Sequence, residues 1–282
     1  MRSKNIETIK IKSEFFNPKD TLTCGQVFRY KPFKNGYLVF SLDKCCYLYE
    51  KEGFTFVESN EIDYFENYFD LKRDYSLIFD RVKSYNNSFL EKAAGLGKGI
   101  RIIKQNACET AFSFIISQNN NIGRITSIIE NLCSTLGEKR EFMGEVYYTF
   151  PKISAFSNQS VDFYKKLGLG YRSEYFYDFS KLLDSGYDFF GLNNLDTISL
   201  EKELLKIRGI GKKVANCIML FGFNRSDSFP VDTWIEKVYK ENLNGKLTNR
   251  EKISSELVYK FKDLSGYIQQ YVFYYKRSLE NK

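Results

Sequence analysis

The sequence predicts an α+β fold, in which an N-terminal antiparallel sheet domain with helices (1–95) precedes a helical domain (96–282). Two observations carry this prediction. Runs rich in Phe, Tyr and Val, separated by Gly-containing turns, fall in the N-terminal part. From about residue 96 onward, apolar residues recur with the period of a helix. A chain of 282 residues is long enough to bury a sizeable core.

The N-terminal part contains three runs typical of strands, GQVFRYKPF (25–33), GYLVFSLDKCCYLYE (36–50) and GFTFVES (53–59). The turn Lys34-Asn35-Gly36 separates the first two runs and suits a tight hairpin. A helical stretch at 61–69 follows. We therefore expect an antiparallel sheet with helices packed on it.

The C-terminal part has seven segments with clear helical periodicity, at 107–117, 122–136, 173–185, 199–207, 212–223, 233–241 and 267–278. Pro151 and Pro230 both fall between these segments, at loop positions. The short gap after residue 207 predicts a helix, a tight turn and a second helix over about 199–223.

The most informative stretch is IRGIGKKVANCIMLFGFNRSDSFPVD (207–232). Its helical face is formed by residues at i, i+3, i+4 and i+7, namely Val214, Cys217, Ile218 and Phe221. Gly209 and Gly211 precede this helix, where a turn needs unusual dihedrals or close backbone approach. The free N–H groups and positive dipole end of the helix suit a phosphate. Lys213 lies in the first turn, where a cation is unfavourable, and a neutral amine is a nucleophile.

Composition excludes several classes of site. Lys plus Arg exceed Asp plus Glu by seven, which fits a polyanionic partner. The chain has no histidine, so His-based triads and His metal sites are excluded. Its six cysteines form no CxxC pair, and none follows Cys217, so we expect no metal and no cofactor. The N-terminus is charged and lacks the apolar region of a signal peptide, so we expect a reduced, intracellular protein that binds no membrane.

Five sequence blocks occur in a defined order: TCGQVFRY (23–30), FSFIISQNNNIGRIT (112–126), LGLGYR (167–172), the stretch at 207–232, and SGYIQQYVF (265–273). Together they resemble the helix-hairpin-helix, Gly-Pro-Asp superfamily of DNA glycosylases, and within it the eukaryote-like first family of 8-oxoguanine DNA glycosylases. The resemblance implies an all-helical helix-hairpin-helix glycosylase region after the sheet. It also implies a monomer that acts on double-stranded DNA containing 8-oxoguanine, at the nucleoid.

The resemblance implies a covalent mechanism. Lys213 matches the family's catalytic lysine, whose amine attacks the sugar C1′, expels the base and forms a Schiff base; β-elimination can then nick the strand. Lys212 beside it is expected to be solvated. Asp232 matches the aspartate that stabilises developing positive charge. Its ordinary alternative is an N-cap of the next helix, and the two roles are compatible.

Four residues match the family's base-binding positions. Gly25 matches the glycine whose carbonyl accepts the N7–H of the oxidised base, where guanine has only a lone pair. Cys217 and Phe273 match residues that sandwich the flipped base. Gln269 matches the glutamine that binds its Watson–Crick edge, with Gln270 as the fallback. A turn glycine and a core cysteine remain the ordinary alternatives for Gly25 and Cys217.

Another set matches residues that contact the duplex. Asn119 fills the space of the flipped base, Tyr171 wedges beside it, and Arg124 and Arg172 donate to the widowed cytosine. A helix cap and surface charges are the ordinary alternatives. The hairpin glycines Gly209 and Gly211 also belong to the DNA-binding set. Trp234 stands where the eukaryotic members usually have a phosphate-contacting histidine, and its indole N–H is able to donate there instead.

Two other functions stay open at this point. One keeps the fold but changes the damaged base, for instance to an alkylated purine or uracil. The other is a non-catalytic protein that uses the hairpin only to bind DNA backbone. Gly25 with Gln269 argues against the first, and Lys213 with Asp232 argues against the second.

Overall fold

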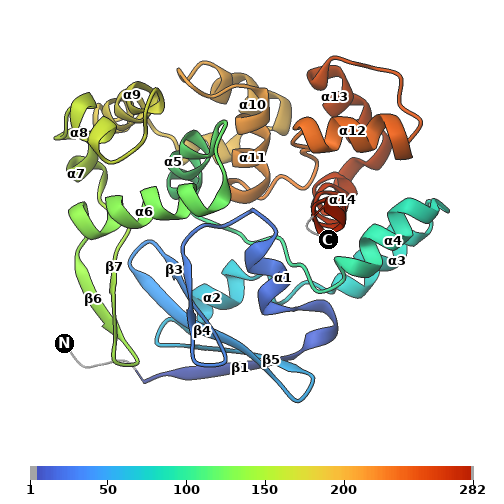
Figure 1. The fold of residues 1–282 in the computed structure, drawn as a ribbon, viewed down its shortest axis with the longest axis horizontal. Coiled ribbons are helices and arrows are strands. Elements are labelled where there is room, and N and C mark those ends of the chain that lie inside the picture. The colour runs from blue at the N-terminus through green and yellow to red at the C-terminus, as the bar shows by residue number, and fades with distance from the viewer. Residues whose placement is uncertain (1–4, 281–282) are drawn as a thin grey trace.

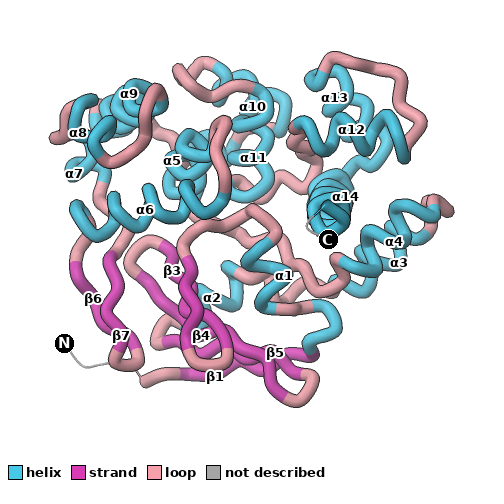
Figure 2. The backbone as a smooth tube through the Cα atoms, in the orientation of Figure 1, coloured by secondary structure: helices cyan, strands magenta, loops and turns pink. Residues whose placement is uncertain are grey.

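The computed structural model describes residues 5–280 and has an antiparallel sheet below a layer of helices (Figures 1 and 2). The sheet has five strands in the order β1-β5-β4-β3-β2. Their bounds are β1 Glu7–Lys12, β2 Tyr30–Phe33, β3 Gly36–Ser41, β4 Lys44–Lys51 and β5 Phe54–Ser59. The predicted α+β class and N-terminal sheet are confirmed.

Two-residue turns set the register of the central strands. Phe33 pairs with Gly36 across the predicted turn, in which Lys34 has a φ of 48°. Glu52 and Gly53 connect β4 to β5, with φ of 52° and 76°. Positive φ at these positions gives the turn the twist that matches the adjoining strands.

The two faces of the sheet are covered differently. One face packs under the short helices α1 (Pro18–Thr23) and α2 (Ile62–Tyr68). Its core includes residues from both the strands and α2, among them Val39, Cys46, Leu48, Val57, Phe65 and Tyr68. On the other face a second hairpin, β6 (Lys139–Phe142) with β7 (Glu145–Tyr148), inserts Phe142 against Leu38 and Tyr47.

Helices form most of the rest of the chain. The N-terminal ones are α3 Tyr75–Lys83, α4 Ser88–Leu96, α5 Ala107–Ser117, α6 Ile122–Leu136, α7 Ile153–Ser157 and α8 Val161–Lys166. The C-terminal ones are α9 Arg172–Asp184, α10 Thr197–Leu205, α11 Lys212–Gly222, α12 Thr233–Asn242, α13 Arg250–Phe261 and α14 Ser265–Glu280. This region is mostly helical and not entirely so, because the β6–β7 hairpin lies within it.

Helix α5 forms the centre of the helical layer (Figure 1). Ten of its eleven residues, 107–116, are buried. It packs along α11, where the Phe114 and Phe221 rings stack with centroids 5.6 Å apart. The long helix α14 packs against α4 and α12. These contacts fix α11 and α14 beside the end of α1, and the candidate site lies at that junction.

The core clusters bear on where a domain boundary would lie. Residues of α3 and α4, including Ile78, Val82 and Leu90, pack in the large helical core, although they precede residue 96. The sheet has its own core. The boundary at residue 95 therefore stays a prediction from the sequence.

Candidate active site

The hairpin between α10 and α11 is built around Gly209. This residue has a φ of 86°, and a β-carbon there would lie 2.4 Å from the Tyr175 ring, so both conformation and packing require glycine. Gly211 differs from the expectation, because its φ of −89° is ordinary and a β-carbon would meet no atom within 4 Å. Gly211 is the N-cap of α11 and offers no side chain to its first N–H groups. Those groups are therefore open to an external acceptor.

The two lysines at the start of α11 have different surroundings. Lys212 Nζ lies 2.8 Å from Glu201 Oε2 on α10, so it is paired and not simply solvated. The Lys213 ammonium lies 5.4 Å from the centroid of the Phe114 ring. It lines the same cavity as Asp232 and Cys217. These two consecutive side chains therefore point in different directions, Lys212 toward Glu201 and Lys213 toward the cavity.

Lys213, Cys217 and Asp232 interact electrostatically. Burial raises the pKa of the Cys217 thiol; the nearby Lys213 ammonium opposes that rise, and the Asp232 carboxylate adds to it. The thiol is therefore neutral at pH 7. An amine, a neutral thiol and a carboxylate border one cavity.

Asp232 has the capping role expected of it. Its Oδ1 accepts a hydrogen bond of 2.9 Å from the Ile235 N–H and caps α12. The same residue lines two adjacent cavities together with Lys213. Asp232 therefore caps α12 and also borders the same cavities as Lys213.

The four base-binding candidates gather at the smaller of these cavities, although they come from three separate elements. Gly25 follows α1, Cys217 lies on α11, and Gln269 and Phe273 lie on α14. Gly25 has a φ of 88°, which favours glycine whatever the role of its carbonyl. A β-carbon at Gly25 would lie 3.4 Å from Phe273 Cε1, so the glycine also keeps this cavity open.

Both glutamines of α14 reach this cavity. Gln269 and Gln270 are buried, and in the described part of the chain neither Oε1 has a hydrogen-bond partner. An unsatisfied buried amide oxygen typically costs about 1–3 kcal/mol. Two buried amide oxygens without a partner therefore belong to residues that border this cavity.

The candidate duplex-reading residues lie where α6 and α9 begin. Asn119 and Tyr171 precede these helices, and Arg124 and Arg172 lie in their first turns. Asn119 has a φ of 46°, and its Nδ2 lies 3.3 Å from the hydroxyl of Tyr171, which is 51% exposed. Asn119 does not cap α6; Asn121 does, by accepting from the Arg124 N–H. Arg124 is exposed and donates to the Gly168 carbonyl at 3.2 Å.

Arg172 lies deeper than expected. It is 5% exposed, and its guanidinium donates to the backbone carbonyls of Gln118, Leu169 and Asn119. The Asn119 carbonyl accepts from Nη2 at 2.9 Å. In this conformation Arg172 fixes the loop that carries Asn119.

A larger cavity of about 580 Å³ connects the hairpin to the loop that carries Asn119. Trp234 on α12 lines it together with Asn119, Gly211, Lys213 and Asp232. The sequence prediction missed Arg250 and Ser254, which also line it, because the helix that contains them, α13, was missed. Arg250 is paired with Glu236 at 2.7 Å.

Two further observations concern metals and membranes. Across residues 5–280, no group of three or more His, Cys, Asp or Glu side chains could hold a metal ion. All six cysteines are buried and free. Within the same residues, no helix has both the length and the apolar composition needed to cross a membrane.

Comparisons with known proteins show which family the chain resembles. Residues 8–111 match the model of the 8-oxoguanine DNA glycosylase N-terminal domain. A probable N-glycosylase/DNA lyase of Methanothermobacter thermautotrophicus is 27% identical over 232 residues, which cover 75% of this chain and 73% of that protein.

Solved structures extend the match to nearly the whole chain. MBOgg1 in complex with a low-affinity DNA ligand is 34% identical, with a TM-score of 0.90 and coverage of 98% of this chain and 99% of that one. The Clostridium acetobutylicum 8-oxoguanine glycosylase/lyase, bound to duplex DNA with cytosine opposite 8-oxoguanine, is 32% identical, with a TM-score of 0.89 and coverage of 99% and 100%. This chain belongs to the 8-oxoguanine DNA glycosylase family of the helix-hairpin-helix superfamily.

Proposed function

We propose that this DNA glycosylase/lyase uses Lys213 as its nucleophile. The unprotonated Nζ attacks C1′ of the damaged nucleotide, the bond from C1′ to the base nitrogen breaks, and the base leaves with a proton. The sugar ring then opens to a Schiff base. Loss of a C2′ proton and departure of the 3′-phosphate complete the β-elimination. The observation that carries this proposal is the meeting of Lys213 and Asp232 in one cavity with the four base-binding candidates.

Asp232 stabilises the positive charge that develops on the sugar as the base departs. A carboxylate fixed by its helix-cap bond is already oriented and needs no reorganisation during the reaction. The chain has no histidine, so proton transfers use the departing base, water, Lys213 itself or Asp232. These assignments require no metal and no cofactor.

The smaller cavity selects the oxidised base. The Gly25 carbonyl accepts the N7–H that 8-oxoguanine has and guanine lacks. Gln269 binds the Watson–Crick edge, and Gln270 is its fallback, because both amide oxygens are unsatisfied at the cavity. Cys217 and Phe273 enclose the two faces of the base.

The loops beside the cavity read the opposite strand. Asn119 occupies the space left by the flipped nucleotide, and Tyr171 wedges beside it. Arg124 and Arg172 donate to N3 and O2 of the widowed cytosine, for which Arg172 exchanges its bonds to the loop carbonyls for bonds to the base. The Clostridium relative was solved with cytosine opposite the lesion, which supports this pairing. The hairpin around Gly209 and Gly211, with Trp234, holds the backbone phosphates.

We further propose that the protein acts as a monomer on double-stranded DNA at the nucleoid. The division of labour between the sheet part (1–95) and the helical part (96–282) belongs to the same proposal, with the chemistry residing mainly in the second. Gly25 is the exception, because the first part supplies it to the base cavity.

Borohydride trapping tests the nucleophile. The wild type is incubated with duplex DNA containing 8-oxoguanine opposite cytosine, reduced, and examined for a covalent complex. Lys213→Gln should abolish both trapping and base excision while duplex binding survives. Lys72→Gln is the matched control, because Lys72 is an exposed lysine paired with Glu66 beside the sheet. Excision by Lys213→Gln at the wild-type rate would refute the proposed nucleophile.

A further inference from the structure

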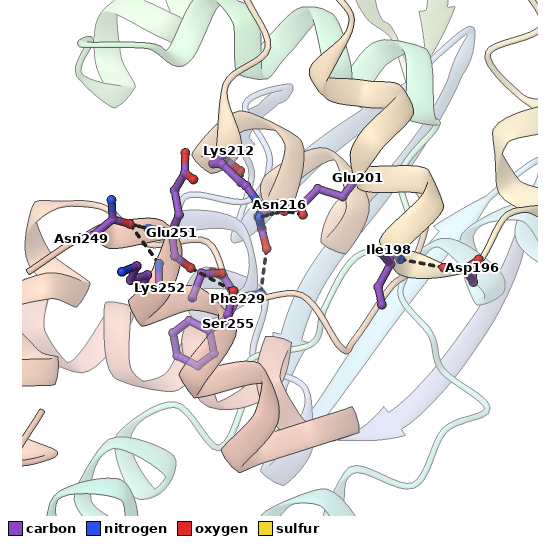
Figure 3. Close-up of polar contacts among 11 residues, drawn as sticks. Asp196, Ile198, Glu201, Lys212, Asn216, Phe229, Asn249, Glu251, Lys252 and Ser255 are labelled. Carbon is purple, nitrogen blue, oxygen red and sulfur yellow. Dashed lines mark hydrogen bonds and ion pairs between the residues drawn. The ribbon is translucent and has the colours of Figure 1, made fainter. Parts of the chain in front are cut away.

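Asn216 lies on α11 between the proposed nucleophile Lys213 and the base-binding Cys217 in the sequence. It is 4% exposed, and its side chain faces α10 and the segment that leads to Asp232 (Figure 3). It has no role in the steps described above. A buried asparagine at this position needs its own explanation.

Every polar group of the Asn216 side chain is used. Nδ2 donates to Glu201 Oε1 at 3.1 Å and to the Lys212 carbonyl at 3.0 Å, and Oδ1 accepts from the Phe229 N–H at 3.1 Å. A backbone N–H only donates and a carboxylate only accepts, so these partners fix the orientation of the amide. Aspartate is nearly the same size but has no donor for Glu201.

Glu201 is itself held in place. Its Oε2 lies 2.8 Å from Lys212 Nζ, so Glu201 bridges the first turn of α11 and the Asn216 amide (Figure 3). The two helices of the hairpin are therefore joined by side chains, and Lys212 and Asn216 border the larger cavity and not the base cavity. Glu201, held by Lys212, therefore restricts the position of the Asn216 side chain.

The other partner of Asn216 begins the segment that presents Asp232. Phe229 is 1% exposed, and its two backbone groups are bound by side chains from two helices. Asn216 accepts from its N–H, and Ser254 on α13 donates to its carbonyl at 2.8 Å. Pro230 follows and restricts the next φ. Asp232 is reached two residues later and is fixed by its cap.

We propose that Asn216 is a positioning residue that sets the place of Asp232 relative to Lys213. One side chain joins the helix that carries the amine to the segment that carries the carboxylate. The inference rests on the proposed function, in which these two residues perform the chemistry. Loss of the Asn216 bonds lets the Phe229 segment shift, and misplacement by about 1 Å can cost on the order of 100-fold in rate.

The test compares chemistry with binding in the full-length protein. Asn216→Leu removes all three hydrogen bonds and keeps the number and branching of the side-chain heavy atoms. We expect its single-turnover excision rate at saturating enzyme to fall by roughly 10- to 100-fold, with the duplex Kd unchanged. Asn216→Asp should fall similarly, because its carboxylate faces Glu201. Combining it with Glu201→Gln restores a donor to the pair and should recover much of the rate.

A double-mutant cycle shows whether Asn216 acts through Asp232. In an Asp232→Asn background, Asn216→Leu should cost little further rate, because the group that it positions has already lost its charge. Asn87→Ala is the stability control, since it removes the cap of the distant helix α4, where Asn87 accepts from the Phe89 and Leu90 N–H groups. It should lower Tm without changing the excision rate.

Failure of the proposed function and failure of the inference about Asn216 would give different results. A wild type that neither excises nor traps through Lys213 would refute the proposed function. If the wild type does both, the inference alone is overturned by a wild-type rate in Asn216→Leu, by independent losses in the cycle, or by a loss confined to Kd. Should Asn216→Leu not fold, Asn216→Asp carries the test; a lowered rate that Glu201→Gln recovers supports the inference, and a wild-type rate overturns it.

Discussion

At the scale of single residues, Asp232 has a charge whose effect can be separated from its structural role. Asp232→Asn keeps an acceptor for the Ile235 N–H, and asparagine is as good an N-cap as aspartate. We expect Tm and lesion binding to be retained and single-turnover excision to fall by roughly 100-fold. Asp196→Asn is the matched control, because Asp196 caps α10 in the same way and lies outside the cavities. A loss confined to Tm would leave Asp232 with the capping role alone.

Gly25 permits a similar separation of strain from site chemistry. Its φ of 88° makes alanine strained by about 1–2 kcal/mol. The new β-carbon would also lie 3.4 Å from Phe273 Cε1 and intrude on the base cavity. We therefore expect Gly25→Ala to lower both Tm and excision of 8-oxoguanine.

Gly53→Ala provides the control for Gly25. Gly53 has a similar φ of 76°, but a β-carbon there meets nothing within 4 Å. It should therefore show a comparable loss of Tm and a wild-type excision rate. Equal activity of the two alanine variants, measured well below their Tm, would contradict a role for Gly25 at the cavity.

At the scale of elements, the capped helices α5 and α6 were predicted well, whereas the capped helices α3, α4 and α13 were not predicted. The predicted bounds of α5 and α6 agree with the structure residue for residue, and Asn106 and Asn121 cap them. The missed α13 had comparable signals, namely Asn249 at its start and buried Ile253, Leu257 and Phe261 at i, i+4 and i+8. The β6–β7 hairpin was harder to predict, because its strands have four residues each, half of those residues are charged, and Phe142 is their one buried residue.

The candidate site was likewise predicted only in part from the sequence. Gly25, Lys213, Cys217, Asp232 and Gln269 line one cavity as a set that the sequence blocks had marked. The connection of Asn216 to Phe229 and of Ser254 to Phe229 could not be predicted, since it depends on how α11 and α13 pack around an irregular segment. The contacts of Arg172 with backbone carbonyls are invisible for the same reason.

The starts of α6 and α9, which carry Arg124 and Arg172, give a further prediction at this scale. We expect the wild type to excise 8-oxoguanine faster opposite cytosine than opposite adenine, because polar contacts of this kind discriminate by about 1–3 kcal/mol. Arg124→Ala combined with Arg172→Ala should bring the two rates close together. Single-turnover excision opposite each of the four bases measures this.

The buried position of Arg172 requires an extra control for that experiment. Removing it also frees the Gln118 and Asn119 carbonyls, so Arg172→Ala alone can weaken binding opposite every base. Arg124 has one bond to a loop carbonyl and is exposed, so Arg124→Ala isolates base reading more cleanly. A preference for cytosine that survives in the double variant would show that other residues provide it.

At the scale of the whole molecule, the chain has no histidine, and this shapes its response to pH. Carboxylates such as Asp43, Asp196 and Asp263 have pKa values lowered by hydrogen bonds and nearby cations. They stabilise the fold above their unfolded pKa, and that contribution is lost as the pH falls below about 4. No side chain with an unperturbed pKa between pH 5 and 8 is present. Stability should therefore be nearly flat across that interval.

The buried thiols predict a steep loss of stability on the alkaline side. Burial raises the pKa of Cys24 and Cys108 to about 12 and that of Cys133 to about 11. An unfolded thiol ionises near pH ~8.5, so above that pH the unfolded state binds fewer protons than the folded state. The contribution of each thiol is complete below ~8.5 and falls by about 1.4 kcal/mol for each further pH unit.

Urea titrations between pH 6 and 10, with reductant present, measure this dependence of the free energy of unfolding on pH. We expect the free energy of unfolding to stay constant up to about pH 8. Above that pH it should fall with a slope that corresponds to the release of several protons, because all six thiols are buried. Cys108→Ala should reduce that slope by about one proton, since Cys108 is a buried thiol of α5 whose pKa is raised by burial alone. Tyrosines ionise near pH ~10 in the unfolded state and add to the slope above about pH 9, so the contribution of the thiols is measured between about pH 8 and 9. A slope that Cys108→Ala leaves unchanged would mean that groups other than the thiols control alkaline unfolding.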